Sequence, residues 1–230
     1  MWMDEIKTSE IQQPVTIFTG YESLQEKAQL LFYKEVEEGC VLVFDKTPFF
    51  ARGGGQVADL GTIDGAEVLD VRDWDGFYLH VVNSKKTYQV GEVLELIVDK
   101  EMRKRISILH SLTHVYWGEI ENILNSKCDQ TYELITHEDS TIEMVTIDEQ
   151  FITQEILDQA IEKVKQDIAL AIPSQIYLED NKPDKRVVTW ENVSFDYCVG
   201  THVLNTSELK PPIILKFKKK ANKHRIKFTF

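Results

Sequence analysis

The chain has 230 residues, 43% of them hydrophobic, and a formal net charge of −12 at pH 7. This length allows one large domain or two small ones, and the composition predicts a packed core and excludes a disordered chain. No apolar run approaches the ~20 residues that a membrane-spanning helix requires.

Two features of the sequence bear on the cell compartment. The first ten residues, MWMDEIKTSE, are charged and lack the apolar stretch of a signal peptide, so we expect none. The cysteines, Cys40, Cys128 and Cys198, are odd in number and widely spaced, which does not indicate a disulfide framework. We therefore expect a cytoplasmic protein that makes no contact with a membrane.

Short apolar runs divided by turn signals fill the first hundred residues. The turns are expected at Asp64-Gly65, Asp75-Gly76 and Val90-Gly91. Strands this short and this regularly spaced are typical of a small barrel or closed sheet. The runs expected to form strands are Cys40–Phe44, Val68–Val71, Phe77–Val82 and Val93–Val98.

After Asp99 the hydrophobic period changes. Apolar residues recur every three or four positions from Ile106 to Leu124, which predicts an amphipathic helix. A strand-like run covers Thr141–Ile147, and a second helix is expected from Thr153, its N-cap, to Leu170. We predict an α+β protein with a small β-barrel-like domain over residues 1–99, followed by an α+β domain over residues 100–230.

Two short motifs in the second domain carry metal-binding residue types. In His110-Ser-Leu-Thr-His114 the imidazoles are four residues apart, which places both on one face of a helix. In Cys198-Val-Gly-Thr-His202 a thiol and an imidazole flank a glycine and can bend around one cation. Each motif alone is weak, but together they supply a donor set that suits Zn²⁺.

A glycine-rich segment, Thr47–Gly61, lies in the first domain. Its three successive glycines, Gly53, Gly54 and Gly55, allow the backbone to approach a ligand closely, and Gln56 ends the run. The spacing fits neither a P-loop nor a dinucleotide-binding fingerprint. The plain alternative for the glycines is a flexible hairpin.

Five motifs, in order along the chain, resemble those of the editing domain of alanyl-tRNA synthetase. The segment Thr47–Gly61 resembles that family's glycine-rich motif, HSLTH its HxxxH motif, and CVGTHV its Cys-Gly-Gly-Thr-His-Val motif. Phe18-Thr-Gly-Tyr21 and Arg225-Ile-Lys-Phe228 resemble the sequences that open and close the domain. Val199 stands where the family usually has glycine, which leaves the conformation of that turn open.

The resemblance implies a medium-length, free-standing member of the AlaX type, without a synthetase catalytic domain. Such a protein is a zinc-dependent hydrolase that removes a wrong amino acid from tRNA(Ala) in trans, with Ser-tRNA(Ala) as the expected substrate and Gly-tRNA(Ala) as a second. Zinc is expected to polarise the ester carbonyl, to activate water, or to hold the amino acid. Four protein ligands would close a catalytic zinc site, so the choice among these roles stays open.

The same resemblance suggests roles for residues outside the ligand set. Gln56 and the amides of the three glycines are expected to support developing charge or to position water, and Gln56 is expected to contribute little to a core. Recognition of the serine hydroxyl is assigned first to Thr47 and then to Thr113. The alternative for each is an ordinary strand or helix threonine.

The end of the chain differs in charge from the rest. The last fifteen residues contain seven Lys or Arg and no acidic residue, whereas the remainder carries a charge of −19. Period-two alternation around residues 219–223 predicts a hairpin with a basic face, where we expect Lys218, Arg225 and Lys227 to contact tRNA. The alternative is a solvated edge strand protected by lysines. The expected apolar face comprises Leu215, Phe217, Ile226, Phe228 and Phe230.

Two other functions remain compatible with the sequence. One is a zinc-containing tRNA-binding module without hydrolytic activity. The other is a zinc hydrolase that acts on a different mischarged tRNA. No prediction is made for the oligomeric state.

Overall fold

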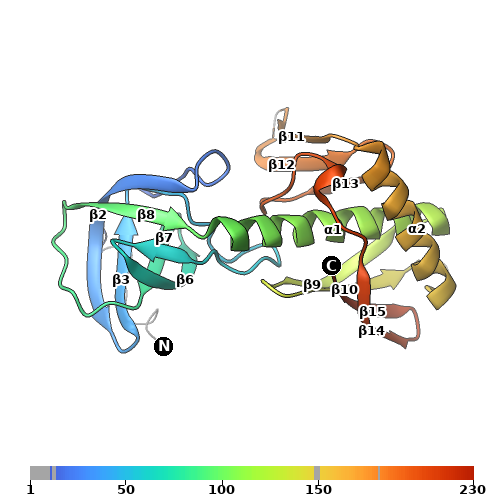
Figure 1. The fold of residues 1–230 in the computed structure, drawn as a ribbon, viewed down its shortest axis with the longest axis horizontal. Helices are drawn as coiled ribbons and strands as arrows, with labels where there is room; N and C mark the ends of the chain where they lie inside the picture. Colours follow the sequence, from blue (N-terminus) through green and yellow to red (C-terminus); the bar gives the residue numbers. More distant parts are fainter. Residues whose placement is uncertain (1–10, 12–13, 148–150, 181) are drawn as a thin grey trace. The chain divides into compact units, whose positions relative to one another are not determined.

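The computed structural model describes residues 11, 14–147, 151–180 and 182–230 (Figure 1). Residues 1–10, on which the expectation about a signal peptide rests, lie outside the described part. The chain packs as two compact units: unit 1 comprises Met1–Gly53 with Val57–Arg103, and unit 2 comprises Gly54–Gln56 with Lys104–Phe230. None of the described helices is long and apolar enough to cross a membrane.

Unit 1 contains a closed barrel whose six strands follow the order β2-β3-β7-β6-β5-β8. A separate parallel pair joins β1 (Ile17–Phe18) to β4 (Lys46–Thr47). The small barrel predicted from the sequence is therefore confirmed, and closure leaves these six strands without an open edge. The barrel strands are β2 (Gln25–Val36), β3 (Gly39–Phe44), β5 (Gly61–Ile63), β6 (Ala66–Trp74), β7 (Phe77–Val82) and β8 (Val93–Val98).

Local sequence explains most of the barrel. The hairpin turns fall at Asp64-Gly65 and Asp75-Gly76, where all four residues have φ between 50° and 84°, as the twist of two-residue hairpins requires. Strand β8 alternates exposed and buried residues along its whole length. Strand β2 was not among the predicted runs, because its ends are polar and its pairing with β3 shifts between Leu30 and Phe32.

Unit 2 is built on the long helix α1 (Lys100–Leu124), whose first turn belongs to unit 1. One antiparallel sheet has the strand order β14-β15-β10-β9, and a second has the order β11-β12-β13. Its other elements are β9 (Cys128–Ile135), β10 (Ser140–Thr146), α2 (Gln154–Leu170), β11 (Ser174–Glu179), β12 (Lys182–Trp190), β13 (Ser194–Tyr197), the 3₁₀ helix η3 (Thr206–Glu208), β14 (Ile213–Lys220) and β15 (Lys223–Thr229).

Helix α1 is more deeply buried than its sequence predicts. Asp99 begins it by accepting hydrogen bonds from the amides of Glu101 and Met102, both at 3.0 Å. Every residue from 106 to 116 is buried, so the expected amphipathic pattern is wrong for this part of the helix. The reason is that α1 shares one core with α2 and with strands of both sheets, and a helix covered on all sides has no exposed face.

The second predicted helix is confirmed. Helix α2 covers Gln154–Leu170, and the side chain of Thr153 accepts a hydrogen bond from the amide of Ile156. At its end Ala171 adopts a left-handed conformation with φ 52°, and its amide bonds back to Ile168.

The predicted C-terminal hairpin also forms, from β14 and β15. Ile226 and Phe228 are fully buried in the core of unit 2, as expected. Leu215, however, is 52% exposed, because the β14–β15 register shifts between Ile214 and Lys216. Ile214 packs against the core instead, so the expected place of Leu215 in the apolar face is wrong.

Candidate functional site

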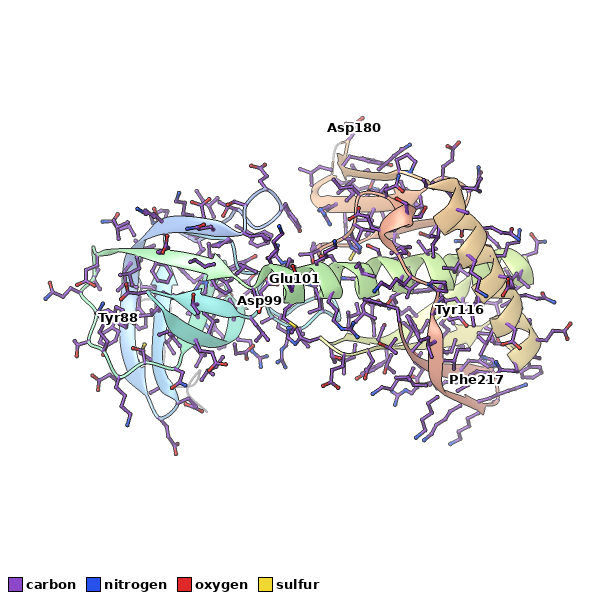
Figure 2. All side chains as sticks on the ribbon, viewed as in Figure 1. Tyr88, Asp99, Glu101, Tyr116, Asp180 and Phe217 are labelled. Carbon is purple, nitrogen blue, oxygen red and sulfur yellow. The ribbon has the colours of Figure 1, made fainter. Side chains whose placement is uncertain are left out.

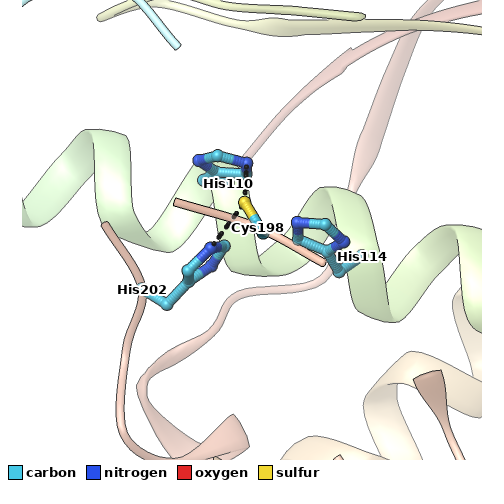
Figure 3. A group of neighbouring side chains, drawn as sticks. All are labelled: His110, His114, Cys198 and His202. Atoms are coloured by element: carbon cyan, nitrogen blue, oxygen red, sulfur yellow. Dashed lines mark hydrogen bonds between the residues drawn. The ribbon is translucent and has the colours of Figure 1, made fainter. Parts of the chain in front are cut away.

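The four predicted ligand residues lie together inside unit 2 (Figure 3). One donor atom from each of His110, His114, Cys198 and His202 lies within 4.8 Å of every other. The Sγ atom of Cys198 lies 3.3 Å from Nε2 of His110 and 3.2 Å from Nε2 of His202. Helix α1 supplies the first two residues, and the segment that follows β13 supplies the other two.

A polar partner orients each imidazole through its Nδ1 atom. Nδ1 of His110 lies 2.8 Å from Oε1 of Gln56, and Nδ1 of His114 lies 2.9 Å from Oδ2 of Asp196. The amide and carboxylate oxygens accept, so both rings carry a proton on Nδ1 and direct Nε2 toward the cluster.

His202 completes this arrangement, since its Nδ1 lies 3.2 Å from Oγ of Ser111. Partners on the second nitrogen are usual for metal-ligating histidines. In addition, Nε2 of His114 is buried and has no hydrogen-bond partner in the described part of the chain. The donor set therefore fits a metal ion.

The pKa values of the three imidazoles in the cluster also favour a bound cation. Burial and the neighbouring His114 lower the pKa of His110 well below its usual value, and burial with both other imidazoles does the same for His202. Burial also disfavours the charged form of His114, but Asp196 and Cys198 outweigh it and raise the pKa well above its usual value. The imidazoles of His110 and His202 are therefore neutral, while the surroundings of His114 favour positive charge, so a bound cation would replace the proton of His114.

The Cys-Val-Gly-Thr-His segment depends on Gly200. A Cβ atom at this position would lie 2.1 Å from Cε1 of His110 and 3.0 Å from Oε1 of Gln56. Val199, where the resembled family usually has glycine, is 50% exposed and is not among the described residues with positive φ. The turn therefore tolerates valine. Arg186 supports it by donating to the carbonyl oxygens of Cys198 and Gly200.

The glycine-rich loop is held against β9. The amide of Ile135 donates to the carbonyl of Gly55 at 2.8 Å. Gly54 and Gly55 have φ of 53° and 78°, and a Cβ atom on Gly55 would lie 2.8 Å from Cγ of Glu133. The loop is thus fixed by close backbone packing, whereas Gly53 belongs to unit 1.

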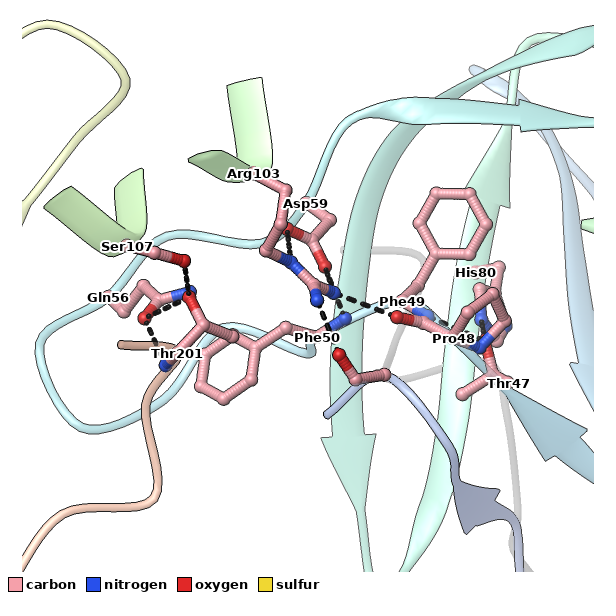
Figure 4. Close-up of polar contacts among 11 residues, drawn as sticks. Thr47, Pro48, Phe49, Phe50, Gln56, Asp59, His80, Arg103, Ser107 and Thr201 are labelled. Carbon is pink, nitrogen blue, oxygen red and sulfur yellow. Dashed lines mark hydrogen bonds and ion pairs between the residues drawn. The ribbon is translucent and has the colours of Figure 1, made fainter. Parts of the chain in front are cut away.

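Gln56 is fully buried, so the expectation that it contributes little to a core is wrong. Figure 4 shows the hydrogen bonds of its side chain. Its Oε1 atom accepts from Nδ1 of His110 and from the amide of Thr201, at 2.8 and 3.0 Å. Its Nε2 atom donates to Oγ1 of Thr201 at 3.1 Å. Ser107 also donates to Thr201. The side chain therefore connects the glycine loop to the cluster.

The two threonines proposed from the sequence have local partners. The hydroxyl of Thr47 lies 2.8 Å from Nε2 of His80 in unit 1. The hydroxyl of Thr113 donates to the carbonyl of Leu109 and lies 2.8 Å from Oγ of Ser140. Both threonines are fully buried, so each hydroxyl stabilises its surroundings.

The aspartate that follows the glycines has a structural role in unit 1 (Figure 4). Asp59 forms a buried ion pair with Arg103 and accepts from the amide of Phe50 at 2.6 Å. Arg103 also donates to the carbonyls of Gly20 and Pro48. This network joins the start of α1 to the Thr-Pro-Phe-Phe segment. The sequence does not predict it, because Arg103 lies in no motif.

A pocket of about 510 Å³ adjoins the cluster within unit 2. His114 and Cys198 form part of its wall, together with Gly54 and Gly55. Further lining residues escaped the sequence analysis because strands distant along the chain bring them here. They include Tyr132, Glu133, Arg186, Asp196 and Tyr197.

Glu133 gives this pocket an acidic wall. Burial raises the pKa of its carboxyl group, and Oε1 has no hydrogen-bond partner in the described part of the chain. Asp196 lies on the same pocket wall. A buried cluster of residues that could hold a metal ion thus lies beside an open pocket.

Known proteins resemble both units. A family model described as "tRNA synthetases class II (A)" matches residues 3–102, and one described as "Threonyl and Alanyl tRNA synthetase second additional domain" matches residues 186–227. The alanine–tRNA ligase of Streptococcus mutans is 33% identical over 76% of this chain and 22% of its own length. Those of Streptococcus sanguinis and Pseudothermotoga lettingae are 32% and 29% identical over 87% and 89% of this chain.

These matches assign the chain to the family of editing domains related to alanyl-tRNA synthetase. The chain spans about a quarter of the length of these relatives.

Proposed function

We propose that the protein is a zinc-dependent hydrolase of the AlaX type, which deacylates mischarged tRNA(Ala) in trans. Ser-tRNA(Ala) is the proposed substrate and Gly-tRNA(Ala) a second one. One observation carries the proposal: three imidazoles, each with a polar partner near Nδ1, gather around the Cys198 sulfur beside a pocket. Membership of the editing-domain family supports this choice of substrate.

The proposed zinc ligands are His110, His114, Cys198 and His202. When bound, zinc would polarise the ester carbonyl, lower the pKa of the attacking water or hold the amino acid. The amides of the glycine run, Gly53–Gly55, are proposed to support negative charge that develops on the carbonyl oxygen.

Gln56 is proposed to act through His110. Both ends of its amide group are hydrogen-bonded within the protein, so it has little capacity to bind substrate as well. By fixing the tautomer and direction of the His110 ring, it keeps Nε2 aimed at the cluster. We therefore assign it a positioning role.

Three basic residues of the C-terminal hairpin are proposed to bind tRNA phosphates: Lys218, Arg225 and Lys227. Arg225 and Lys227 also form ion pairs with Glu143 and Asp139. Lys218 forms no ion pair within the described part of the chain. The cytoplasm, where tRNA is charged, is the proposed location.

The function is tested by incubating metal-replete protein with Ser-tRNA(Ala), Gly-tRNA(Ala) and Ala-tRNA(Ala) and following deacylation. We expect hydrolysis of the seryl ester and resistance of the alanyl ester. Binding of tRNA without hydrolysis of any ester would favour a non-catalytic binding module. Hydrolysis confined to another mischarged tRNA would favour a hydrolase of different specificity.

Recognition of the serine hydroxyl by Thr47 or Thr113 remains a prediction. Because both hydroxyls are hydrogen-bonded inside the fold, each Thr→Val change should also cost about 1 kcal/mol of stability. The decisive measurement is the ratio of seryl to alanyl deacylation rates, which we expect to fall in one of the two variants. An unchanged ratio in both variants would reject the assignment.

A further inference from the structure

The solvent-facing side of the β14-β15-β10-β9 sheet carries a row of polar and aromatic residues. Lys218 pairs with Arg225, Arg225 with Glu143, and Glu143 with Tyr132. Residues directly opposite each other across a sheet lie on the same face. On the other face His224 and Ile226 are fully buried. The row therefore crosses all four strands on the exposed side.

This face concentrates positive charge, and Figure 2 shows long nitrogen-tipped side chains projecting from β14 and β15. Like-charged residues stand directly opposite each other in three cross-strand pairs, which destabilises a hairpin in isolation. The carboxylates of Glu143 and Asp139 pair with some of these cations. The pairs are Lys216 with Lys227, Lys218 with Arg225, and Lys220 with Lys223.

Protection of a sheet edge explains only part of this charge. Lysines on β14 would discourage pairing with another chain, because β14 is the edge strand. Strand β15 lies between β14 and β10, so its cations Lys223, Arg225 and Lys227 have no edge to protect. Glu143 and Asp139 pair with all three of them, and the lysines of β14 leave this face with a net positive charge that suits an anionic partner.

Tyr132 links this face to the pocket. It is 39% exposed and lines the pocket beside the metal-binding cluster. The guanidinium carbon of Arg225 lies 4.7 Å from the centre of its ring. An exposed aromatic ring next to a cation is the arrangement with which proteins bind unpaired nucleobases.

We propose that Tyr132 stacks against an unpaired nucleobase at the acceptor end of an RNA, while Arg225 binds the adjoining phosphate. This inference rests on the proposed function, since the stacked nucleotide is the one that carries the amino acid ester. The lysines of β14 and β15 then contact phosphates further along the RNA.

The test uses two small esters: 2′(3′)-O-seryl-adenosine, which has a base, and serine methyl ester, which has none. For Tyr132→Ala we expect kcat/KM to fall about tenfold on the adenosine ester and to stay unchanged on the methyl ester. Tyr132→Phe keeps the ring and should behave as the parent. Tyr177→Ala is the matched control, because Tyr177 is 46% exposed and does not line the pocket.

Equal losses on both esters, or the same loss in the phenylalanine variant, would overturn the proposal. A second measurement separates its failure from that of the proposed function. Binding of the unacylated oligonucleotide ACCA, followed by fluorescence anisotropy, needs no hydrolysis. If the parent hydrolyses no ester but Tyr132→Ala weakens this binding several-fold, stacking stands and the hydrolase proposal falls. Unchanged binding in Tyr132→Ala overturns stacking.

Discussion

At the scale of single residues, three side chains orient the imidazoles of the cluster. Gln56, Ser111 and Asp196 each lie at hydrogen-bond distance from one Nδ1 atom. They come from the glycine loop, from α1 and from β13. Changes to these partners should therefore alter metal binding without removing a ligand.

The ligand set itself gives the first residue-scale prediction. Replacing Cys198 and His114 together with alanine should reduce zinc from one ion per chain to none, because two donors cannot hold the ion tightly. Elemental analysis of metal-replete protein measures this. Cys128→Ala is the control, since Cys128 is also buried but lies outside the cluster. An unchanged zinc content in the double variant would refute the assignment.

Gln56 gives the second residue-scale prediction. Gln56→Ala leaves Nδ1 of His110 and the amide of Thr201 without their acceptor, and each unsatisfied buried group costs about 1–3 kcal/mol. We expect a lower melting temperature and a zinc affinity reduced about 10- to 100-fold. Gln56→Glu retains an acceptor and should bind zinc more tightly than the alanine variant. The exposed Gln159→Ala is the control; a matching loss there would argue against a specific role.

At the scale of elements, the C-terminal hairpin combines two roles. The buried side of β15 contributes Ile226 and Phe228 to the core of unit 2. Its exposed side presents the basic residues. Truncating the hairpin would therefore disturb folding and binding together, whereas changes of charge on the exposed side separate them.

Lys218→Glu with Lys227→Glu should raise the apparent KM for mischarged tRNA. Losing two phosphate contacts should also make the slope of log K against log salt concentration less negative by about 2. Zinc content should not change. The control is Lys27→Glu with Lys85→Glu, two exposed lysines of unit 1, which alters the net charge equally. If both double variants bind tRNA as tightly as the parent at low salt, the edge-protection role prevails.

At the scale of the whole molecule, a buried carboxyl group makes stability depend on pH. Asp167 of α2 is 7% exposed, and one of its oxygens has no partner in the described part of the chain. Burial, together with Glu119 of α1, raises its pKa from 3.8 to about 7. The folded state therefore holds this proton more tightly than the unfolded chain. Stability falls as pH rises from about 4 to about 7, then levels off.

Asp167→Asn removes this titration. The stability of this variant relative to the parent should increase between pH 5 and pH 7 and stay constant above pH 7. The reason is that only the parent has a buried charge at position 167 once the carboxyl group is ionised. Urea unfolding at fixed zinc concentration, compared between the two proteins at each pH, measures the difference. Asp158→Asn, an exposed position on the same helix, should show no such trend. A pH-independent difference for Asp167→Asn would contradict the assignment.

Local signals in the sequence determined the elements that depend on near neighbours. The Asp-Gly turns require left-handed backbone at two successive residues, and they separate the barrel strands correctly. Thr153 caps α2 through its own side chain. The HxxxH and CxxxH spacings identified the four residues whose donor atoms the fold brings within 4.8 Å of one another. They could do so because the two residues of each pair are only four positions apart in the chain.

Tertiary structure alone decided the surroundings of these residues. Gln56 forms hydrogen bonds with His110 and Thr201, which are 54 and 145 positions away in the chain. No short-range pattern in the sequence indicates such contacts. Burial of α1 on all sides depends on two sheets and a helix that follow it in the chain. The row from Lys218 to Tyr132 exists only through the register of four strands. Sequence thus specified the ligands and turns, whereas long-range packing determined which groups orient them and which surface adjoins the pocket.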